Sequence, residues 1–103
     1  MPTYNKLVRD KIPQIIRASG KNPVTKILSQ SDLVKALKEK LKEECEEFEE
    51  SETLEELADI SEVVIALANI LGSSRDELEE TMATKRSTNG GFQEGIFLLE
   101  VLS

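Results

Sequence analysis

The stretch 31–72 reads SDLVKALKEKLKEECEEFEESETLEELADISEVVIALANILG. Apolar residues recur every three or four positions on either side of the polar run 49–53, a spacing that is typical of two amphipathic helices. We predict one helix over 31–50 and a second that ends at 71. Ser51 or Thr53 can cap the second helix, and Thr53 with the glutamate three positions later fits a capping box. Because the connection is short, the two helices are expected to be antiparallel neighbours.

Shorter elements flank this pair of helices. We predict a helix over 13–19, a strand or extended arm over 24–28, and a further helix over 73–86 that ends before a glycine-rich turn. The run 96–101 is rich in strand formers, and its natural partner is 24–28. The expected architecture is therefore all-α, a single domain over 1–103 with a small two-stranded β element.

Composition narrows the chemistry that this chain can perform. It carries 13 basic and 20 acidic residues, for a net charge of −7, with no histidine and one cysteine. Such a chain is unsuited to binding DNA or RNA backbones, and the lack of histidine excludes Ser-His-Asp triads and His-ligated zinc. No stretch is apolar enough for a membrane span or a signal peptide, and Cys45 alone cannot form an internal disulfide. We expect a soluble cytoplasmic protein, with Cys45 packed as a thiol.

Two acidic pairs lie on helix faces that should be apolar. At about 100° per residue, Glu44 falls inside the apolar stripe of the first long helix, and Glu47 lies beside it. In the second long helix, Asp59 lies within an apolar strip and Glu56 lies at the edge of that strip. The short connection should therefore make the two pairs, each spaced i, i+3, face each other.

Four carboxylates cannot share a partly buried site without compensation. Repulsion and desolvation push protons onto some of them unless a cation intervenes. An all-oxygen set suits Mg²⁺, or Mn²⁺, rather than zinc. We therefore predict a metal site formed by Glu44, Glu47, Glu56 and Asp59. The alternative is that these side chains extend to water or pair with lysines across the bundle.

The second long helix is expected to be apolar on two faces. Its main stripe consists of Leu54, Leu57, Ile60, Val64, Ile65, Leu67, Ala68 and Leu71. A second strip behind the first contains Val63, Ala66 and Ile70. Both faces have to be covered, and a domain this small has too few helices to cover them alone. We therefore expect a homodimer or a higher homo-oligomer.

Three ordered motifs resemble those of a known family. They are YNKLVRDKIP at 4–13, EECEE at 43–47 followed by ELAD at 56–59, and KR at 85–86 followed by GGF at 90–92. Together they resemble the MazG-like all-α nucleoside triphosphate pyrophosphohydrolases, and in particular a subgroup labelled phosphoribosyl-ATP pyrophosphohydrolase-like. The resemblance covers nearly the whole chain.

This resemblance implies a helical bundle and a ligand set for Mg²⁺. By the ExxE…ExxD pattern of the family, the metal ligands are Glu44, Glu47, Glu56 and Asp59. The gap of eight residues between Glu47 and Glu56 is shorter than in many members, so the connecting loop has no room for extra substrate contacts.

The implied reaction is hydrolysis of a nucleoside triphosphate between the α and β phosphates, which yields the monophosphate and pyrophosphate and removes unwanted nucleotides. Glu47, at the edge of the stripe, is the candidate general base. An acidic protein must still hold a polyphosphate, and the candidate phosphate contacts are Lys6, Arg9, Lys11, Lys85 and Arg86. Their alternative roles are solubility and, for the last two, interaction with a helix C-terminus.

Two other functions stay open at this level. One is hydrolysis of phosphoribosyl-ATP in histidine biosynthesis, which the label of the subgroup suggests. The other is a non-catalytic module that binds nucleotide or mediates dimerisation. An intact set of four carboxylates favours an enzyme, because a purely structural bundle has no reason to place acids on apolar faces.

Overall fold

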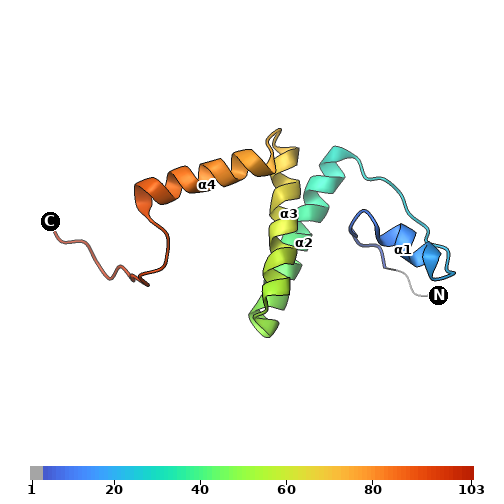
Figure 1. Ribbon diagram of the computed structural model, residues 1–103, viewed down its shortest axis with the longest axis horizontal. Helices are drawn as coiled ribbons and strands as arrows, with labels where there is room; N and C mark the ends of the chain where they lie inside the picture. The colour runs from blue at the N-terminus through green and yellow to red at the C-terminus, as the bar shows by residue number, and fades with distance from the viewer. Residues whose placement is uncertain (1–3) are drawn as a thin grey trace.

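The computed structural model describes residues 4–103, which form four α-helices and, within that range, no strand. They are α1 (Ile12–Ala18), α2 (Gln30–Ser51), α3 (Leu54–Ile70) and α4 (Arg75–Asn89). Figure 1 shows α2 and α3 side by side in the middle, α1 on the N-terminal side, and α4 leading away toward the C-terminus. The prediction of an all-α fold is confirmed.

Hydroxyl side chains begin the three longer helices. Each hydroxyl oxygen accepts a hydrogen bond from the backbone N–H three residues later and so satisfies one free amide of the first turn. These pairs are Ser29 with Asp32 at 3.3 Å, Thr53 with Glu56 at 3.3 Å, and Ser74 with Glu77 at 3.1 Å. The cap at Thr53 confirms the prediction, whereas α2 begins earlier than expected because Ser29 provides its cap.

The connection between α2 and α3 consists of two residues. Glu52 closes α2 in the left-handed conformation, at φ +50°, and its N–H donates to the carbonyl of Phe48 at 2.8 Å. Thr53 then caps α3. Because the link is so short, α3 runs back along α2, and residues at similar distances from the turn lie opposite each other in the hairpin.

The core lies between α2 and α3 and is small. The buried apolar side chains within residues 4–103 are Leu37, Val63 and Ala68, and Glu44 is buried with them. Val63 was expected on the second strip of α3, so this strip helps to form the interface with α2. From the predicted main stripe, Leu54 stays 81% exposed. Ala68 of the main stripe is buried as well, so both faces contribute to the core, while part of the larger stripe is left uncovered in the single chain.

The outer helices do not close a compact bundle around this hairpin. Within the described part of the chain, α4 contacts α3 alone, and α1 contacts no other helix. A bend of 104° separates α3 from α4. No single helix of residues 4–103 is long and apolar enough to cross a membrane, although α3 and α4 taken together reach that length and composition.

The predicted β element over 24–28 and 96–101 is wrong. Both segments lack a strand partner, and Val24 and Ile27 are almost completely exposed. Figure 1 shows the physical reason, because α4 carries the C-terminal segment to the end of the molecule opposite the linker between α1 and α2. Strand-forming residues become a strand only when a partner lies within reach.

The left-handed residue in the hairpin provides a test of this geometry. Glu52→Gly should make the protein more stable than Glu52→Ala by about 1 kcal/mol, since glycine adopts positive φ without the steric cost of a Cβ. Both variants remove the same charge. At Glu46, in the middle of α2, the order should reverse by about 1 kcal/mol. Urea unfolding at one protein concentration measures both differences, and the same order at the two positions would contradict the turn.

Candidate metal centre

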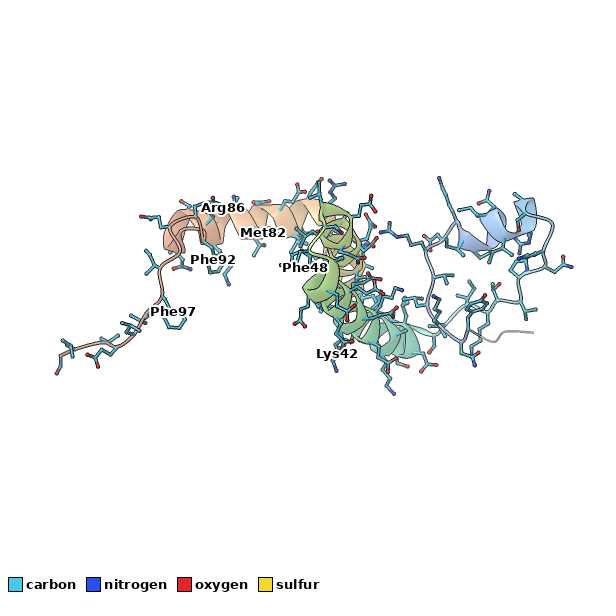
Figure 2. The ribbon with its side chains drawn as sticks, turned by 90° about the horizontal axis from the view of Figure 1, so that it is seen from below. Lys42, Phe48, Met82, Arg86, Phe92 and Phe97 are labelled. Atoms are coloured by element: carbon cyan, nitrogen blue, oxygen red, sulfur yellow. The ribbon has the colours of Figure 1, made fainter. Side chains whose placement is uncertain are left out.

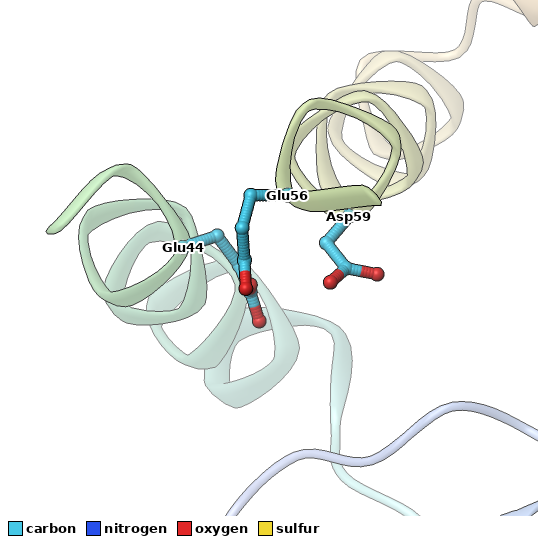
Figure 3. A group of neighbouring side chains, drawn as sticks. All are labelled: Glu44, Glu56 and Asp59. Carbon is cyan, nitrogen blue, oxygen red and sulfur yellow. The ribbon is translucent and has the colours of Figure 1, made fainter. Parts of the chain in front are cut away.

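Three carboxylates converge where the first turns of α3 lie beside α2. Glu44 projects from α2, two helical turns before its end, and Glu56 and Asp59 project from the start of α3. One oxygen from each residue can be chosen so that all three lie within 4.8 Å of one another. Figure 3 shows the three side chains pointing into the same space between the helices. The prediction that the acids of the two helices face each other is confirmed for these three.

Glu44 is the buried member of this cluster, with 6% of its surface exposed. One of its oxygens, Oε1, lies 3.4 Å from Nζ of Lys40, one turn earlier in α2. Its other oxygen, Oε2, is buried without a hydrogen-bond partner among the described residues, and so is Oε2 of Glu56. Burying a carboxylate oxygen without a partner is costly, so these atoms indicate a missing cation or donor.

Asp59 has a cationic partner from a distant part of the chain. The guanidinium of Arg9, fifty residues away in sequence, donates from Nη2 to Asp59 Oδ1 at 2.6 Å. Arg9 belongs to the segment that precedes α1, and this pair is partly exposed. Sequence reasoning had proposed Arg9 only as a phosphate contact, because no periodicity links the N-terminal segment to a particular position in α3.

Glu47 lies beside the three carboxylates without being one of them. Its side chain is exposed, one turn beyond Glu44 in α2. When protonated, Glu47 can donate a hydrogen bond to Glu44, and this bond, together with repulsion by the Glu44 carboxylate, raises the pKa of Glu47 above its ordinary value of 4.5. Glu47 therefore shares the electrostatic field of the cluster, while the structure does not group it with the three candidate ligands.

Glu56 also holds its proton more tightly than an isolated glutamate. Desolvation by burial is the largest cause that raises the pKa of Glu56 above 4.5. A hydrogen bond that protonated Glu56 can donate to Glu44 acts in the same direction, as does repulsion by the charges of Glu44 and Asp59. A hydrogen bond that protonated Glu47 can donate to Glu56 acts in the opposite direction. In the metal-free protein, the crowded negative charge thus favours the protonated form of Glu56.

The donor set fits a hard divalent cation. Ligand oxygens held about 2.1 Å from an octahedral Mg²⁺ are separated by roughly 3 to 4.2 Å, so small side-chain adjustments suffice to bring the three oxygens around one ion. Among the ion pairs of residues 4–103, Arg9 pairs with Asp59, Lys40 is shared between Glu43 and Glu44, and none involves Glu47 or Glu56. The carboxylates therefore keep a net negative charge, which a divalent ion would offset.

Among residues 4–103, the remaining predicted phosphate contacts make no ion pair with the carboxylates of the cluster. Lys6 sits 5.8 Å from the centre of the Tyr4 ring, and Lys11 is exposed just before α1. Lys85 and Arg86 are in the last turns of α4, and Figure 2 shows Arg86 near the far end of that helix, close to the turn that contains Phe92. Of the five basic residues, Arg9 is the one that this chain pairs with a carboxylate of the cluster.

Two local features of α2 differ from the sequence-based expectations. The ion pair of Lys40 with Glu44 was not predicted from the sequence. Their i, i+4 spacing puts both residues on one helix face and could have predicted this pair. Cys45 was expected to be packed, but it is exposed. Within the described residues, α3 covers α2 on the side of Glu44, and the next residue is rotated by about 100° away from that side.

Comparisons with known proteins provide a partial match. A protein of Mycolicibacterium smegmatis, described as uncharacterized, is 49% identical over 47 residues. The match covers 46% of this chain and 48% of that protein, so the chain spans about half the length of the curated relative that it matches. No family model matches the sequence. No solved structure matches it either.

The raised pKa values predict how the metal-free protein responds to pH. Folding strengthens proton binding at Glu47 and Glu56, so their contribution to stability is fully present below pH 4.5 and is lost as the pH rises through their folded-state pKa values. At pH 7.5 in EDTA, Glu56→Gln should therefore raise the melting temperature and flatten its fall with pH. Glu46→Gln removes the same charge from an exposed position and serves as the control. Equal effects of the two variants would contradict the carboxylate repulsion.

Proposed function

We propose that this chain is a Mg²⁺-dependent nucleotide pyrophosphohydrolase of the MazG-like class. It hydrolyses a nucleoside triphosphate between the α and β phosphates to the monophosphate and pyrophosphate, and its role is to remove unwanted nucleotides. The observation that carries the proposal is the buried, unpartnered oxygen of Glu44, whose carboxylate lies in a cluster with Glu56 and Asp59. A cation would stabilise such an oxygen, and the order of the acids along the chain is that of the ExxE…ExxD pattern.

Glu44, Glu56 and Asp59 would hold the ion, and Mn²⁺ suits the same oxygens. When bound, the metal would supply positive charge to the phosphate oxygens and lower the pKa of the attacking water. Mg²⁺ commonly uses few protein carboxylates and completes its shell with water and substrate phosphates. A small cluster that is partly open to solvent is suited to that arrangement.

Glu47 is the proposed general base. It lies next to the three ligands but outside their set, so its carboxylate is free to accept a proton. Water attacks one of the two phosphorus atoms, the bridging oxygen leaves with the other phosphate, and the proton from water passes to Glu47.

The basic residues of the N-terminal segment are the proposed phosphate contacts nearest to the cluster. Arg9 already lies at the cluster, with Lys6 and Lys11 in the same segment. Lys85 and Arg86 lie toward the end of α4, which contacts α3 alone among the helices of residues 4–103, and we propose that they act on a site in a neighbouring copy. A planar guanidinium binds two phosphate oxygens at once, which suits Arg9 and Arg86 for this role.

The surface of the chain supports an assembly of identical copies. The chain exposes 9492 Å², whereas a compact monomer of 11.5 kDa exposes about 5,800 Å². Its radius of gyration is 18.2 Å, compared with about 13 Å for a compact domain of this length. The excess of about 3,700 Å² per chain exceeds each partner's share of an ordinary dimer interface, as expected for an intertwined dimer or a higher homo-oligomer.

Much of this excess surface is apolar and lies at the C-terminal end. Phe92 is 97% exposed, and the exposed apolar residues that follow it are Ile96, Phe97, Leu98, Leu99, Val101 and Leu102. Figure 2 shows Phe92 and Phe97 projecting from the extended segment beyond α4. A second copy is the occupant that matches these side chains, because part of the apolar stripe of α3 is uncovered in every copy.

Activity is tested by the release of pyrophosphate. Canonical and modified nucleoside triphosphates, deoxynucleoside triphosphates and phosphoribosyl-ATP are incubated with the protein in Mg²⁺ or in EDTA. We expect pyrophosphate and monophosphate in Mg²⁺ alone, and a loss of at least roughly a hundredfold in kcat/KM for Glu56→Gln combined with Asp59→Asn. Glu46→Gln is the matched control and should retain activity.

The panel also separates the other functions. Turnover of phosphoribosyl-ATP alone would assign the histidine-biosynthesis reaction. Binding of nucleotide without turnover, by a protein with a native helical spectrum, would assign a non-catalytic module. Full activity of the double variant would overturn the proposed site.

The assembly is tested by light scattering coupled to size-exclusion chromatography. We expect a mass of at least twice 11.5 kDa at micromolar concentration. Leu99→Glu should shift the protein toward the monomer, because it places a charge in the apolar surface, whereas Gln93→Glu in the same segment should not. A measured mass of one chain for the wild-type protein would contradict the proposed homo-oligomer.

A further inference from the structure

The N-terminal segment is attached to the helical hairpin through the candidate metal centre. Within the described part of the chain, α1 packs against no other helix, and the ion pairs other than that of Arg9 join residues three or four apart in one helix. The bond from Arg9 Nη2 to Asp59 Oδ1 therefore links the segment before α1 to α3.

This contact puts a cation where the cluster needs one. Asp59 is one of three carboxylates with oxygens within 4.8 Å of each other, and the neighbouring Glu44 contributes a buried oxygen that has no partner among the described residues. The guanidinium of Arg9 offsets part of this negative charge. A divalent ion held by the same carboxylates would offset it more completely and would repel the guanidinium.

The ion pair of Arg9 with Asp59 is weak enough for a divalent cation to replace the arginine. The side chains of Arg9 and Asp59 are 57% and 40% exposed. Exposed ion pairs of this kind contribute little to stability, because water and salt screen them. A ligand for the cluster therefore meets only a small barrier from the arginine.

We propose that Arg9 is an exchangeable counter-ion of the metal centre: it pairs with Asp59 in the metal-free chain, and a divalent cation releases it together with the N-terminal segment. The released guanidinium then becomes available to bind the phosphates of the nucleotide. This inference rests on the metal centre of the proposed function. It adds an order of events, in which metal binding precedes and prepares the phosphate contact.

The first test measures the motion of the segment itself. Tyr4 is the single tyrosine of a chain that lacks tryptophan, so the intrinsic fluorescence anisotropy reports on the N-terminal segment. In the wild-type protein, Mg²⁺ should lower this anisotropy. In Arg9→Ala the anisotropy should be low already and should not respond to Mg²⁺. A rise in the anisotropy of the wild-type protein on addition of Mg²⁺ would overturn the release.

The second test measures competition for the site. Mn²⁺ binding is followed by electron paramagnetic resonance at 0.15 M salt, without substrate. Arg9→Ala should bind Mn²⁺ about two- to fivefold more tightly than the wild-type protein, the range that corresponds to loss of an exposed ion pair. Lys11→Ala removes the same charge from the same segment and should change the affinity by less than about 1.5-fold, because no carboxylate is paired with Lys11 among residues 4–103.

The outcomes separate this inference from the proposed function. Absence of Mn²⁺ binding by the wild-type protein would overturn the metal centre and the exchange together. If the wild-type protein binds Mn²⁺ tightly and Arg9→Ala binds it with the same affinity, the exchange alone is overturned. The same holds if Arg9→Ala and Lys11→Ala increase the Mn²⁺ affinity equally. Circular dichroism should show unchanged helicity in Arg9→Ala, because no helix packs through this side chain.

Discussion

The structure depends on the packing of α2 against α3, and the centre of this contact contains a charge. Leu37, Val63 and Ala68 supply the buried apolar surface, and Glu44 is buried among the same helices. Three apolar side chains give a small driving force, and a buried carboxylate works against it. Because a ligand that binds only the folded state stabilises that state, a cation at the cluster would strengthen the contact on which the other elements depend.

The parts of this fold that could be predicted from the sequence are those that local rules determine. The cap at Thr53 and the short link after it follow from hydrogen bonding within a few residues, and together they make the hairpin. Helical periodicity then places Glu44 on the buried side of α2. These two predictions suffice to bring Glu44, Glu56 and Asp59 together, as the structure has them.

The features that could not be predicted depend on contacts between distant parts of the chain. Arg9 and Asp59 are fifty residues apart, and nothing in either local sequence selects the other. The strand-forming residues at 96–101 had a plausible partner in sequence, but α4 carries them away from it. Periodicity also shows that α3 has two apolar faces without showing which of them meets α2, so the burial of Val63 had to come from the structure.

The two-residue turn at Glu52 and Thr53 also sets the rotational phase of α3 relative to α2. One residue inserted there would rotate α3 by about 100° around its own axis if the start of the helix stayed in place. Both helices would survive such an insertion, yet Glu56 and Asp59 would no longer point toward Glu44. The length of the turn is therefore as much a part of the metal centre as the carboxylates, although neither residue of the turn belongs to the cluster.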